Sequence, residues 1–308
     1  MSAVRLSVVV LSWNTREILR ACLASLERDA PCEPREIIVV DNGSRDGSAG
    51  MVAREFPEVR LIANPENRLY AEGNNQGARA ATGRYLCLLN SDTEVRPGAL
   101  DRLTGFLESH PEYGAVAPKL VNPDGTVQRA CRRFPSLLEP LVESTSLGNL
   151  PPGSWLSWWW GMGDFDHQHS RDVLQPPGAC LVSRTAEYRE LGGLDPSLSL
   201  FFNDVDLCLQ LWRKGRRIRY LAEAEVMHHL GYSTRAQDPR HRNLLWVQNR
   251  AAYFRKNHGR LGERWLRAVF GLWALECQLR IRFGSRERAA RQQALAELDG
   301  FVRKCVQA

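Results

Sequence analysis

Apolar and polar residues alternate in blocks over residues 4–120, and these blocks predict a βαβα succession. Short runs that are apolar almost throughout predict five strands, at Leu6–Leu11, Glu36–Val40, Val59–Ala63, Tyr85–Leu89 and Ala115–Ala117. Between them, apolar residues recur at helical spacing over 15–28, 47–56, 71–81 and 98–109. Strands without a polar face are typical of a parallel sheet that helices cover on both sides. We therefore predict an α/β fold with a doubly wound, mostly parallel sheet.

The pattern changes after residue 120. Residues 121–172 are rich in Pro, Gly and Ser and hold a tryptophan cluster, which predicts a long loop over the site, carrying Trp155, Trp158, Trp159 and Trp160. A second ordered block follows, with a strand at Val173–Arg184, a helix over 204–215 and strands near 217–221 and 225–229. From about residue 240 the chain is helical, with breaks at Gly259, Gly262 and Gly284. We divide it into 1–120 and 121–237, two halves of one domain, and a C-terminal extension, 238–308.

Length and composition allow a full hydrophobic core, because the chain has 308 residues and 44% of them are hydrophobic. The eight cysteines stand singly without a C-x-x-C pair, which favours reduced thiols and a cytoplasmic protein. No apolar stretch approaches the ~18 residues that a membrane-spanning helix needs. The apolar run Leu6–Leu11 is too short for a signal-peptide core. We therefore expect neither secretion by this route nor an integral membrane protein.

Basic residues concentrate at the C-terminal end. Residues 240–308 hold 15 Lys and Arg against 5 Asp and Glu, whereas residues 1–239 hold 26 against 30, which together give the net charge of +6. Such asymmetry predicts contact with an anionic surface, either a membrane or a nucleic acid. The tail lacks a recognisable nucleic-acid-binding motif, so we expect no nucleic acid partner.

The same tail carries large apolar residues in helical stripes, at Tyr253, Phe254, Trp265, Leu266, Val269, Phe270, Leu272, Trp273, Cys277 and Ile281. Between and around them lie Arg250, Arg255, Lys256, Arg260, Arg264, Arg267, Arg280 and Arg282. This composition is typical of an interfacial helix and predicts peripheral contact of 240–308 with the inner face of the cytoplasmic membrane. The alternative is that the stripes pack on protein, within this chain or in a homo-oligomer.

Small polar and acidic residues follow three of the predicted strands, in the runs Ser12-Trp13-Asn14, Asp41-Asn42-Gly43-Ser44 and Asn90-Ser91-Asp92-Thr93-Glu94. The carboxyl ends of parallel strands meet at one edge of a sheet, where ligands bind. Asn42-Gly43 and Asp46-Gly47 are equally typical of turns. Asp92 lies too far upstream of the helix that begins at Pro97 to cap it. Its carboxylate is therefore a candidate to hold Mg²⁺ or Mn²⁺ against a diphosphate.

A nucleotide at this edge is not held by a glycine-rich loop. The turn after the first strand lacks the G-x-G-x-x-G of dehydrogenases, and the chain lacks the G-x-x-x-x-G-K-[ST] of P-loop NTPases. A sugar-nucleotidyltransferase also needs a glycine-rich first loop with basic residues, whereas Ser12-Trp13-Asn14-Thr15 stands there.

Several motifs, in order, resemble those of family 2 inverting glycosyltransferases of the GT-A fold. The runs 7–14 and 38–48 resemble the family's opening, and Asn64-Pro65, Asn67 and Gly73-Asn74-Asn75 its third-strand segment. Leu89-Asn90-Ser91-Asp92-Thr93 resembles a reduced D-x-D motif. The later matches are Pro177-Gly178-Ala179-Cys180, Gly192-Gly193-Leu194-Asp195, Asn203-Asp204-Val205-Asp206 in the place of the E-D motif, and His228. The resemblance covers about residues 4–258 and is greatest with bacterial rhamnosyltransferases that build cell-surface polysaccharide.

The resemblance implies a role for each matching residue. In the nucleotide-sugar-binding half, 1–120, Asp41 would contact the base or ribose, Ser12, Asn14 and Asn75 would line the same pocket, and Asp92 would hold Mn²⁺ or Mg²⁺ on the diphosphate. In the acceptor-binding and catalytic half, 121–237, Gly178, Ala179 and Asn203 would meet the acceptor, Asp204 would be the general base, and His228 would complete the metal shell. The implied partners are a nucleotide-sugar donor, with dTDP-rhamnose favoured, and a glycan or lipid-linked acceptor.

Alternatives remain open at several of these positions. Asp204 and Asp206 could instead cap and start the helix that follows them, where negative charge is favoured. His228 could be a buried histidine bonded to backbone. Asn203 replaces the Glu usual in the family, Leu69 and Glu72 replace common glycines, and Asn90 replaces the first Asp of D-x-D. A degenerate member that binds a nucleotide sugar or glycan without turnover is therefore the alternative function.

Overall fold

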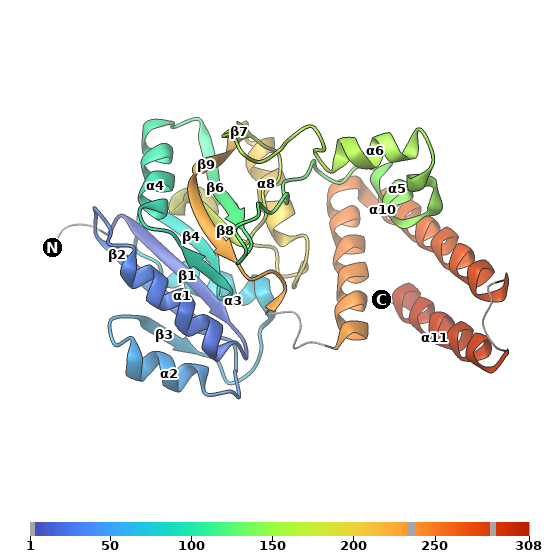
Figure 1. The fold of residues 1–308 in the computed structure, drawn as a ribbon, viewed down its shortest axis with the longest axis horizontal. Helices are drawn as coiled ribbons and strands as arrows, with labels where there is room; N and C mark the ends of the chain where they lie inside the picture. The colour runs from blue at the N-terminus through green and yellow to red at the C-terminus, as the bar shows by residue number, and fades with distance from the viewer. Residues whose placement is uncertain (1–3, 233–237, 284–287, 308) are drawn as a thin grey trace. The chain divides into compact units, whose positions relative to one another are not determined.

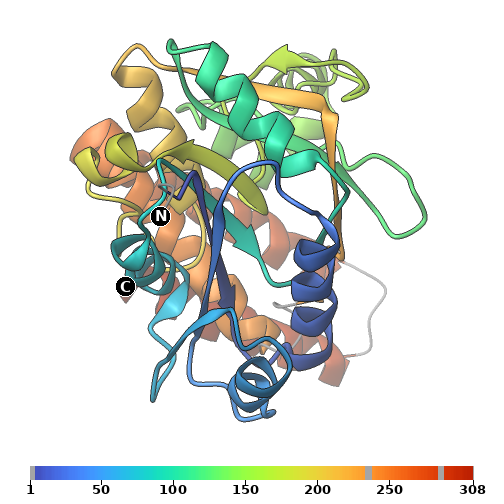
Figure 2. The same cartoon turned by 90° about the vertical axis from the view of Figure 1, so that its left-hand side faces the viewer.

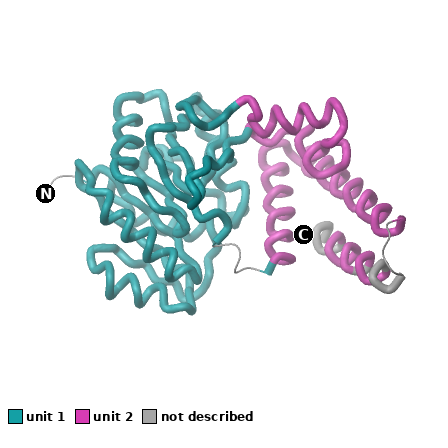
Figure 3. Tube along the Cα trace, in the orientation of Figure 1, with its two compact units in different colours: residues 1–132, 165–238 teal, residues 133–164, 239–308 magenta. Residues whose placement is uncertain are grey.

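The chain forms two compact units, each built from two stretches of sequence (Figure 3). The computed structural model describes residues 4–232, 238–283 and 288–307. Unit 1 comprises residues 1–132 and 165–238, and unit 2 comprises 133–164 and 239–308. All candidate site residues fall in unit 1. The sequence-based halves 1–120 and 121–237 both contribute to unit 1, but residues 133–164 belong with the C-terminal stretch.

Unit 1 is built on a nine-stranded sheet in the order β3-β2-β1-β4-β8-β6-β9-β5, with β7 also paired to β9 (Figure 1). Its strands are β1 (Leu6–Ser12), β2 (Arg35–Asp41), β3 (Arg60–Ala63), β4 (Tyr85–Asn90), β5 (Thr93–Val95), β6 (Tyr113–Val121), β7 (Arg171–Asp172), β8 (Cys180–Arg184) and β9 (Arg217–His228). Its helices are α1 (Arg16–Arg28), α2 (Ser48–Glu55), α3 (Leu69–Ala80), α4 (Ala99–Ser109), α7 (Thr185–Glu190) and α8 (Asn203–Arg213).

The sheet is mixed. Strands β1 to β4 pair in parallel, as the βαβα pattern predicts, whereas β8 runs antiparallel between β4 and β6. The strand expected at Val173–Arg184 was too long, because β8 begins only at Cys180. Pro176-Pro177 precedes it, and prolines cannot donate to a strand ladder. The two strands expected near 217–221 and 225–229 form one strand, β9.

Helices cover both faces of this sheet (Figures 1 and 2). One face buries Val8 and Val10 of β1 in a cluster with apolar side chains of α1, α2 and α4. The opposite face packs on α3 at close range. A Cβ at Gly77 would lie 2.3 Å from Val9 Cγ1, and one at Gly73 would lie 2.4 Å from Leu11 Cδ1. Only glycine lets α3 approach the strands this closely.

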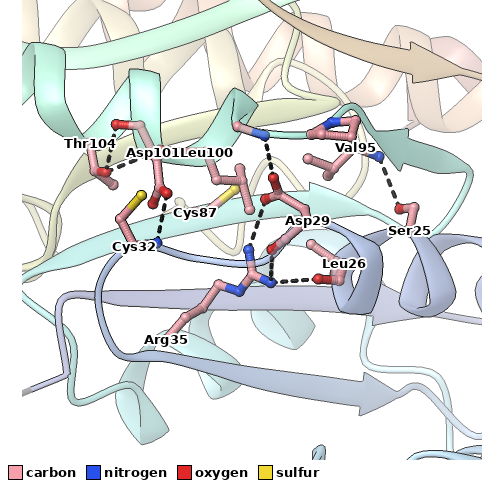
Figure 4. A network of polar contacts seen from close by, with 12 residues as sticks. Ser25, Leu26, Asp29, Cys32, Arg35, Cys87, Val95, Leu100, Asp101 and Thr104 are labelled. Carbon is pink, nitrogen blue, oxygen red and sulfur yellow. Dashed lines mark hydrogen bonds and ion pairs between the residues drawn. The ribbon is translucent and has the colours of Figure 1, made fainter.

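A polar network holds the α1–β2 connection against the segment between β5 and α4 (Figure 4). Asp29 and Arg35 form a buried ion pair at 2.9 Å, and Asp29 Oδ1 accepts the Gly98 N–H at 2.6 Å. Ser25 Oγ accepts the Val95 N–H at 2.9 Å. A buried charge is tolerated when paired and hydrogen-bonded, as Asp29 is here. The network fixes β5, and with it the polar turn that contains Asp92.

Unit 2 is helical, with α5 (Glu139–Ser144), η1 (Ser146–Asn149), α6 (Gly153–Trp160), α10 (Pro239–Phe283) and α11 (Arg288–Gln307). The long loop expected over 121–172 is therefore wrong for 139–160, where three short helices form. Gly259 interrupts α10 with a left-handed φ of 70°, as predicted, but the helix continues through Gly262. The break expected at Gly284 lies outside the described residues.

The centre of unit 2 contains a cluster of ionisable side chains around one buried arginine. The Arg250 side chain is inaccessible to solvent and pairs with Glu139 and, at 2.8 Å, with Glu143. Tyr253, Phe254, Leu266 and Val269 are buried around α10, so these four residues of the predicted stripes pack on protein. No helix within the described residues is both long and apolar enough to cross a bilayer.

Candidate functional site

The carboxyl ends of β1, β2 and β4 lie side by side, as the sequence predicted. Ser12 is the register partner of Asp41, and Leu11 is the partner of Asn90. This pairing gathers the polar runs that follow the three strands at one edge of the sheet.

Asp41 presents an unpaired oxygen at this edge. The residue is 2% exposed, and its Oδ2 accepts the Ser44 N–H at 3.1 Å. Oδ1 is buried and accepts no hydrogen bond from the described residues. A buried acceptor without a donor is costly, so this oxygen is suited to a ligand that brings a hydroxyl or N–H.

Ser12 and Asn14 hold the surrounding loops together. Ser12 Oγ lies 2.9 Å from Thr15 Oγ1, which in turn lies 3.1 Å from Ser91 Oγ. Asn14 adopts a left-handed φ of 53°; its N–H donates to Ser44 Oγ and its Oδ1 accepts the Arg45 N–H. Both residues therefore tie the loop after β1 to its neighbours and shape the edge around Asp41.

Asn75 is engaged in the protein interior. Its Oδ1 accepts hydrogen bonds from Tyr188 Oη at 2.7 Å and the Leu194 N–H at 2.9 Å, and its Nδ2 donates to the Leu194 carbonyl at 2.7 Å. These bonds connect α3 with the Gly192-Gly193-Leu194 turn. These hydrogen bonds let Asn75 position the two segments, and the donor contact expected of it stays a prediction.

Asp92 and His228 meet through antiparallel pairing of β5 with β9. Thr93 is the register partner of His228, which places the imidazole Nε2 3.5 Å from Asp92 Oδ1. Both residues are buried. His228 Nδ1 lies 3.0 Å from Gln128 Oε1, so this ring nitrogen bonds a side chain.

The Asp92 and His228 side chains fit a divalent cation in their chemistry. A carboxylate oxygen is a ligand that both Mn²⁺ and Mg²⁺ prefer, whereas an imidazole nitrogen is a ligand for a transition metal such as Mn²⁺ and seldom for Mg²⁺. Within the described residues, no group of three His, Cys, Asp or Glu side chains gathers around one point. Two protein ligands suffice where substrate phosphates supply the others.

Asp204 lies at the first turn of α8 with its carboxylate held from two sides. Oδ2 accepts the Gly178 N–H at 3.0 Å, and Oδ1 accepts the Val205 N–H at 2.9 Å. Burial raises the pKa of Asp204 above its usual value, against these two hydrogen bonds, which lower it. A partly accessible carboxylate with a raised pKa is a stronger base than an ordinary aspartate and is suited to accept a proton.

Gly178 leaves room for the Asp204 carboxylate, because a Cβ at this position would lie 2.7 Å from Asp204 Oδ2. Ala179 is buried, and its carbonyl accepts the Asn90 N–H at 2.9 Å. Asn203 is also buried, and its Nδ2 donates to the Leu198 carbonyl at 3.2 Å. The acceptor contacts expected of these three residues stay predictions.

Tyr70, which the sequence did not single out, connects the strand end that precedes Asp92 with the segment that bonds Asp204. Its hydroxyl donates to Asn90 Oδ1 at 3.0 Å and lies 3.4 Å from the Gly178 carbonyl. Burial raises the pKa of Tyr70, and the negative charges of Asp204 and Asp92 add to that rise. An aromatic residue at helical spacing carries no sequence signal for such a role.

Solved structures share this architecture. Mannosyltransferase PcManGT from Pyrobaculum calidifontis, in complex with GDP-Man and Mn²⁺, matches with a TM-score of 0.58 at 15% identity, over 99% of this chain and 87% of that one. S. aureus TarS matches with a TM-score of 0.53 at 16% identity, over 96% and 71%. The fold is therefore that of GT-A glycosyltransferases.

The sequence comparisons give the family. The profile described as "Glycosyl transferase family 2" matches residues 7–172, more than half of the chain, and "Glycosyltransferase like family 2" matches 159–253. The chain belongs to glycosyl transferase family 2, and it is a glycosyltransferase.

Curated relatives match along most of this chain. The N-acetylglucosaminyl-diphospho-decaprenol L-rhamnosyltransferase of Mycobacterium tuberculosis is 27% identical over 95% of this chain and 98% of its own length. The O-antigen biosynthesis protein RfbC of Myxococcus xanthus is 28% identical over 90% of this chain, but over only 21% of its own length.

Proposed function

We propose that this chain is an inverting, metal-assisted glycosyltransferase in which Asp204 is the general base. The observation that carries the proposal is the Tyr70 bridge between Asn90 and Gly178, which brings the turn of Asp92 and the carboxylate of Asp204 to one site. Donor binding and proton removal then occur at the same sheet edge.

The donor half of the site is supplied by Asp41, Asp92 and His228. The unpaired Asp41 oxygen would accept a hydrogen bond from the nucleotide base or ribose. Asp92 and His228 would hold Mn²⁺ or Mg²⁺, which stabilises the negative charge of the departing diphosphate when bound.

The transfer itself is one displacement. The acceptor oxygen forms a bond to the anomeric carbon as the bond between that carbon and the diphosphate oxygen breaks, and the electron pair leaves with the nucleoside diphosphate. Asp204 takes the hydroxyl proton. Attack from the face opposite the leaving group inverts the configuration of the carbon.

The proposed donor is dTDP-rhamnose, and the proposed acceptor is lipid-linked. Support comes from the Mycobacterium tuberculosis relative, whose name gives a rhamnosyl transfer to a decaprenol-linked sugar and which aligns with this chain over 98% of its length. A thermal-shift screen of nucleotide sugars with Mn²⁺ tests the donor. Stabilisation by UDP-sugars but not by dTDP-sugars would contradict it.

Asp204→Asn tests the mechanism. We expect normal donor affinity and transfer at least ~100-fold slower, since general-base help contributes typically 10²–10⁴. Asp206→Asn is the matched control, because Asp206 lies on the same turn but contacts Gln210 at 3.3 Å. Near-normal turnover by Asp204→Asn would refute the assignment. Donor binding by the unaltered chain without transfer or hydrolysis would favour the degenerate, non-catalytic alternative.

A lipid-linked acceptor requires access to a membrane, and α10 presents a surface for it. After the interruption at Gly259, exposed apolar side chains follow one helical face, at Leu261, Trp265, Leu272, Leu275, Leu279 and Phe283. Arg264 and Arg282 flank this face, which we name the α10 stripe. Apolar residues with flanking arginines are suited to the interface of an anionic leaflet. We therefore propose that the enzyme works at the inner face of the cytoplasmic membrane.

Vesicle co-sedimentation tests this placement with the full chain. We expect it to pellet with vesicles that contain phosphatidylglycerol and to be released at high salt. The double variant Leu272→Glu/Leu275→Glu should remain in solution. If this variant binds vesicles as the unaltered chain does but forms a smaller oligomer by light scattering, the α10 stripe is instead an interface between two copies of the chain.

A further inference from the structure

Gln128 is a polar residue that no part of the mechanism above uses. It is 8% exposed and contacts His228 with both ends of its amide. Nε2 donates to the His228 carbonyl oxygen and to Asn122 Oδ1, each at 2.8 Å, and Oε1 lies 3.0 Å from His228 Nδ1.

The orientation of this amide is fixed by groups that can only accept. A backbone carbonyl offers no proton, so the amide nitrogen of Gln128 must face it. Asn122 requires the same orientation of Gln128. Its Nδ2 donates to Thr126 Oγ1 at 2.8 Å, so the atom that faces the Gln128 amide nitrogen is the accepting oxygen Oδ1. The Thr126 hydroxyl proton goes to Asp124 Oδ1 at 2.6 Å, and this bond and the Thr126 N–H lower the pKa of Asp124. Asp124 is therefore an ionised, accepting anchor.

This orientation determines the tautomer of His228. Because Gln128 Oε1 accepts, Nδ1 must carry the ring proton. In this tautomer Nε2 carries its lone pair on the side of Asp92 Oδ1, 3.5 Å away. The opposite tautomer would place a proton where a metal ligand needs an electron pair.

We propose that Gln128 is a positioning residue that holds His228 in the tautomer whose Nε2 binds the divalent cation. The inference rests on the metal-assisted function proposed above. The hydrogen bonds that link Asn122, Thr126 and Asp124 keep the Gln128 amide from flipping.

Mn²⁺ affinity measured by electron paramagnetic resonance tests the inference without an activity assay. Mn²⁺ is titrated alone and in the presence of UDP or dTDP. Gln128→Met keeps the side-chain length and loses both polar ends, so we expect binding to weaken about 10–100-fold, the effect typical of outer-shell partners. Gln128→Glu keeps an acceptor opposite Nδ1 and should recover part of the affinity. Gln168→Met, the same change at an exposed site, should bind as the unaltered chain does.

A double-mutant cycle separates positioning from general destabilisation. Once His228→Ala has removed the ligand, Gln128→Met should cause no further loss of Mn²⁺ affinity. An additive loss, or full affinity in Gln128→Met with its melting temperature unchanged, would overturn the inference. If Asp92→Asn abolishes Mn²⁺ binding while Gln128→Met leaves it intact, this inference fails and the proposed function stands. If the unaltered chain binds no Mn²⁺ under any of these conditions, both fail.

Discussion

Gly178→Ala is a sharp test of the Asp204 assignment, because it adds one methyl group at a measured distance from the base. The new Cβ would lie 2.7 Å from Asp204 Oδ2 and 2.9 Å from Asp204 Cβ. Carbon and oxygen atoms of this kind pack at ~3.5 Å, so the carboxylate or the 176–178 segment must move by several tenths of an ångström. Displacements approaching 1 Å at a reacting group cost up to about 10² in rate.

We therefore expect kcat to fall about 10–100-fold in Gly178→Ala, equivalent to ~1.4–2.7 kcal/mol in the activation barrier. The KM for the donor should change little, since Asp41 and Asp92 are untouched. The hydrogen bond from the Gly178 N–H lowers the pKa of Asp204. If the displaced carboxylate loses this hydrogen bond, the pKa rises and the acidic limb of the rate profile moves to higher pH.

The assay is steady-state transfer with melting temperature as the folding control. Gly105→Ala is the matched variant, because Gly105 lies within α4 with no atom within 4 Å of a new Cβ. It should retain full activity and gain up to ~1 kcal/mol in stability. A kcat for Gly178→Ala within twofold of the unaltered chain would show that Asp204 is not the base or does not need this position.

Three further predictions follow from the contacts described. Asp41→Asn should weaken UDP or dTDP binding about 10–100-fold by calorimetry, because a hydrogen bond to a charged group contributes ~1.5–3 kcal/mol; unchanged affinity would contradict the nucleotide contact. Tyr70→Phe should lower kcat about 2–10-fold, as one neutral hydrogen bond is lost, and an unchanged rate would leave Tyr70 with a packing role only. Burial, then Glu143, raises the pKa of Glu139 from 4.5 to about 8, so the folded state holds a proton that the unfolded chain releases. The free energy of unfolding should therefore fall as pH rises across that window, and Glu139→Gln should flatten this slope in urea titrations at pH 5 and pH 8.

Local pattern predicted the N-terminal half of the fold well. The strands β1, β2 and β4 are apolar runs whose burial is a local property, so their positions could be read from sequence. The segment 139–160 could not, because its helices depend on packing with residues 239–308, far along the chain. A single sequence does not show which distant segments meet.

Some residues of the candidate site could likewise be predicted from the sequence, and others could not. Asp41 and Asp92 follow strands, and parallel strands share an edge, so their proximity could be predicted. Gln128 and Tyr70 acquire their roles only through contacts with His228 and Gly178, about a hundred residues away. Their side-chain types are ordinary for buried positions and gave no signal.

The discontinuity of unit 2 has a consequence for how the chain is made. Helices α5, η1 and α6 leave the ribosome before residues 165–238, which take roughly 4–15 s to synthesise at ~5–20 residues per second. During that interval Glu139 lacks Arg250, and α5 lacks α10, against which it packs in the finished chain. Unit 2 is therefore completed last, and the nascent chain is most vulnerable to aggregation in this period. Removal of the C-terminal stretch would make that transient state permanent, so point variants on the surface of α10 perturb the molecule far less than truncation does.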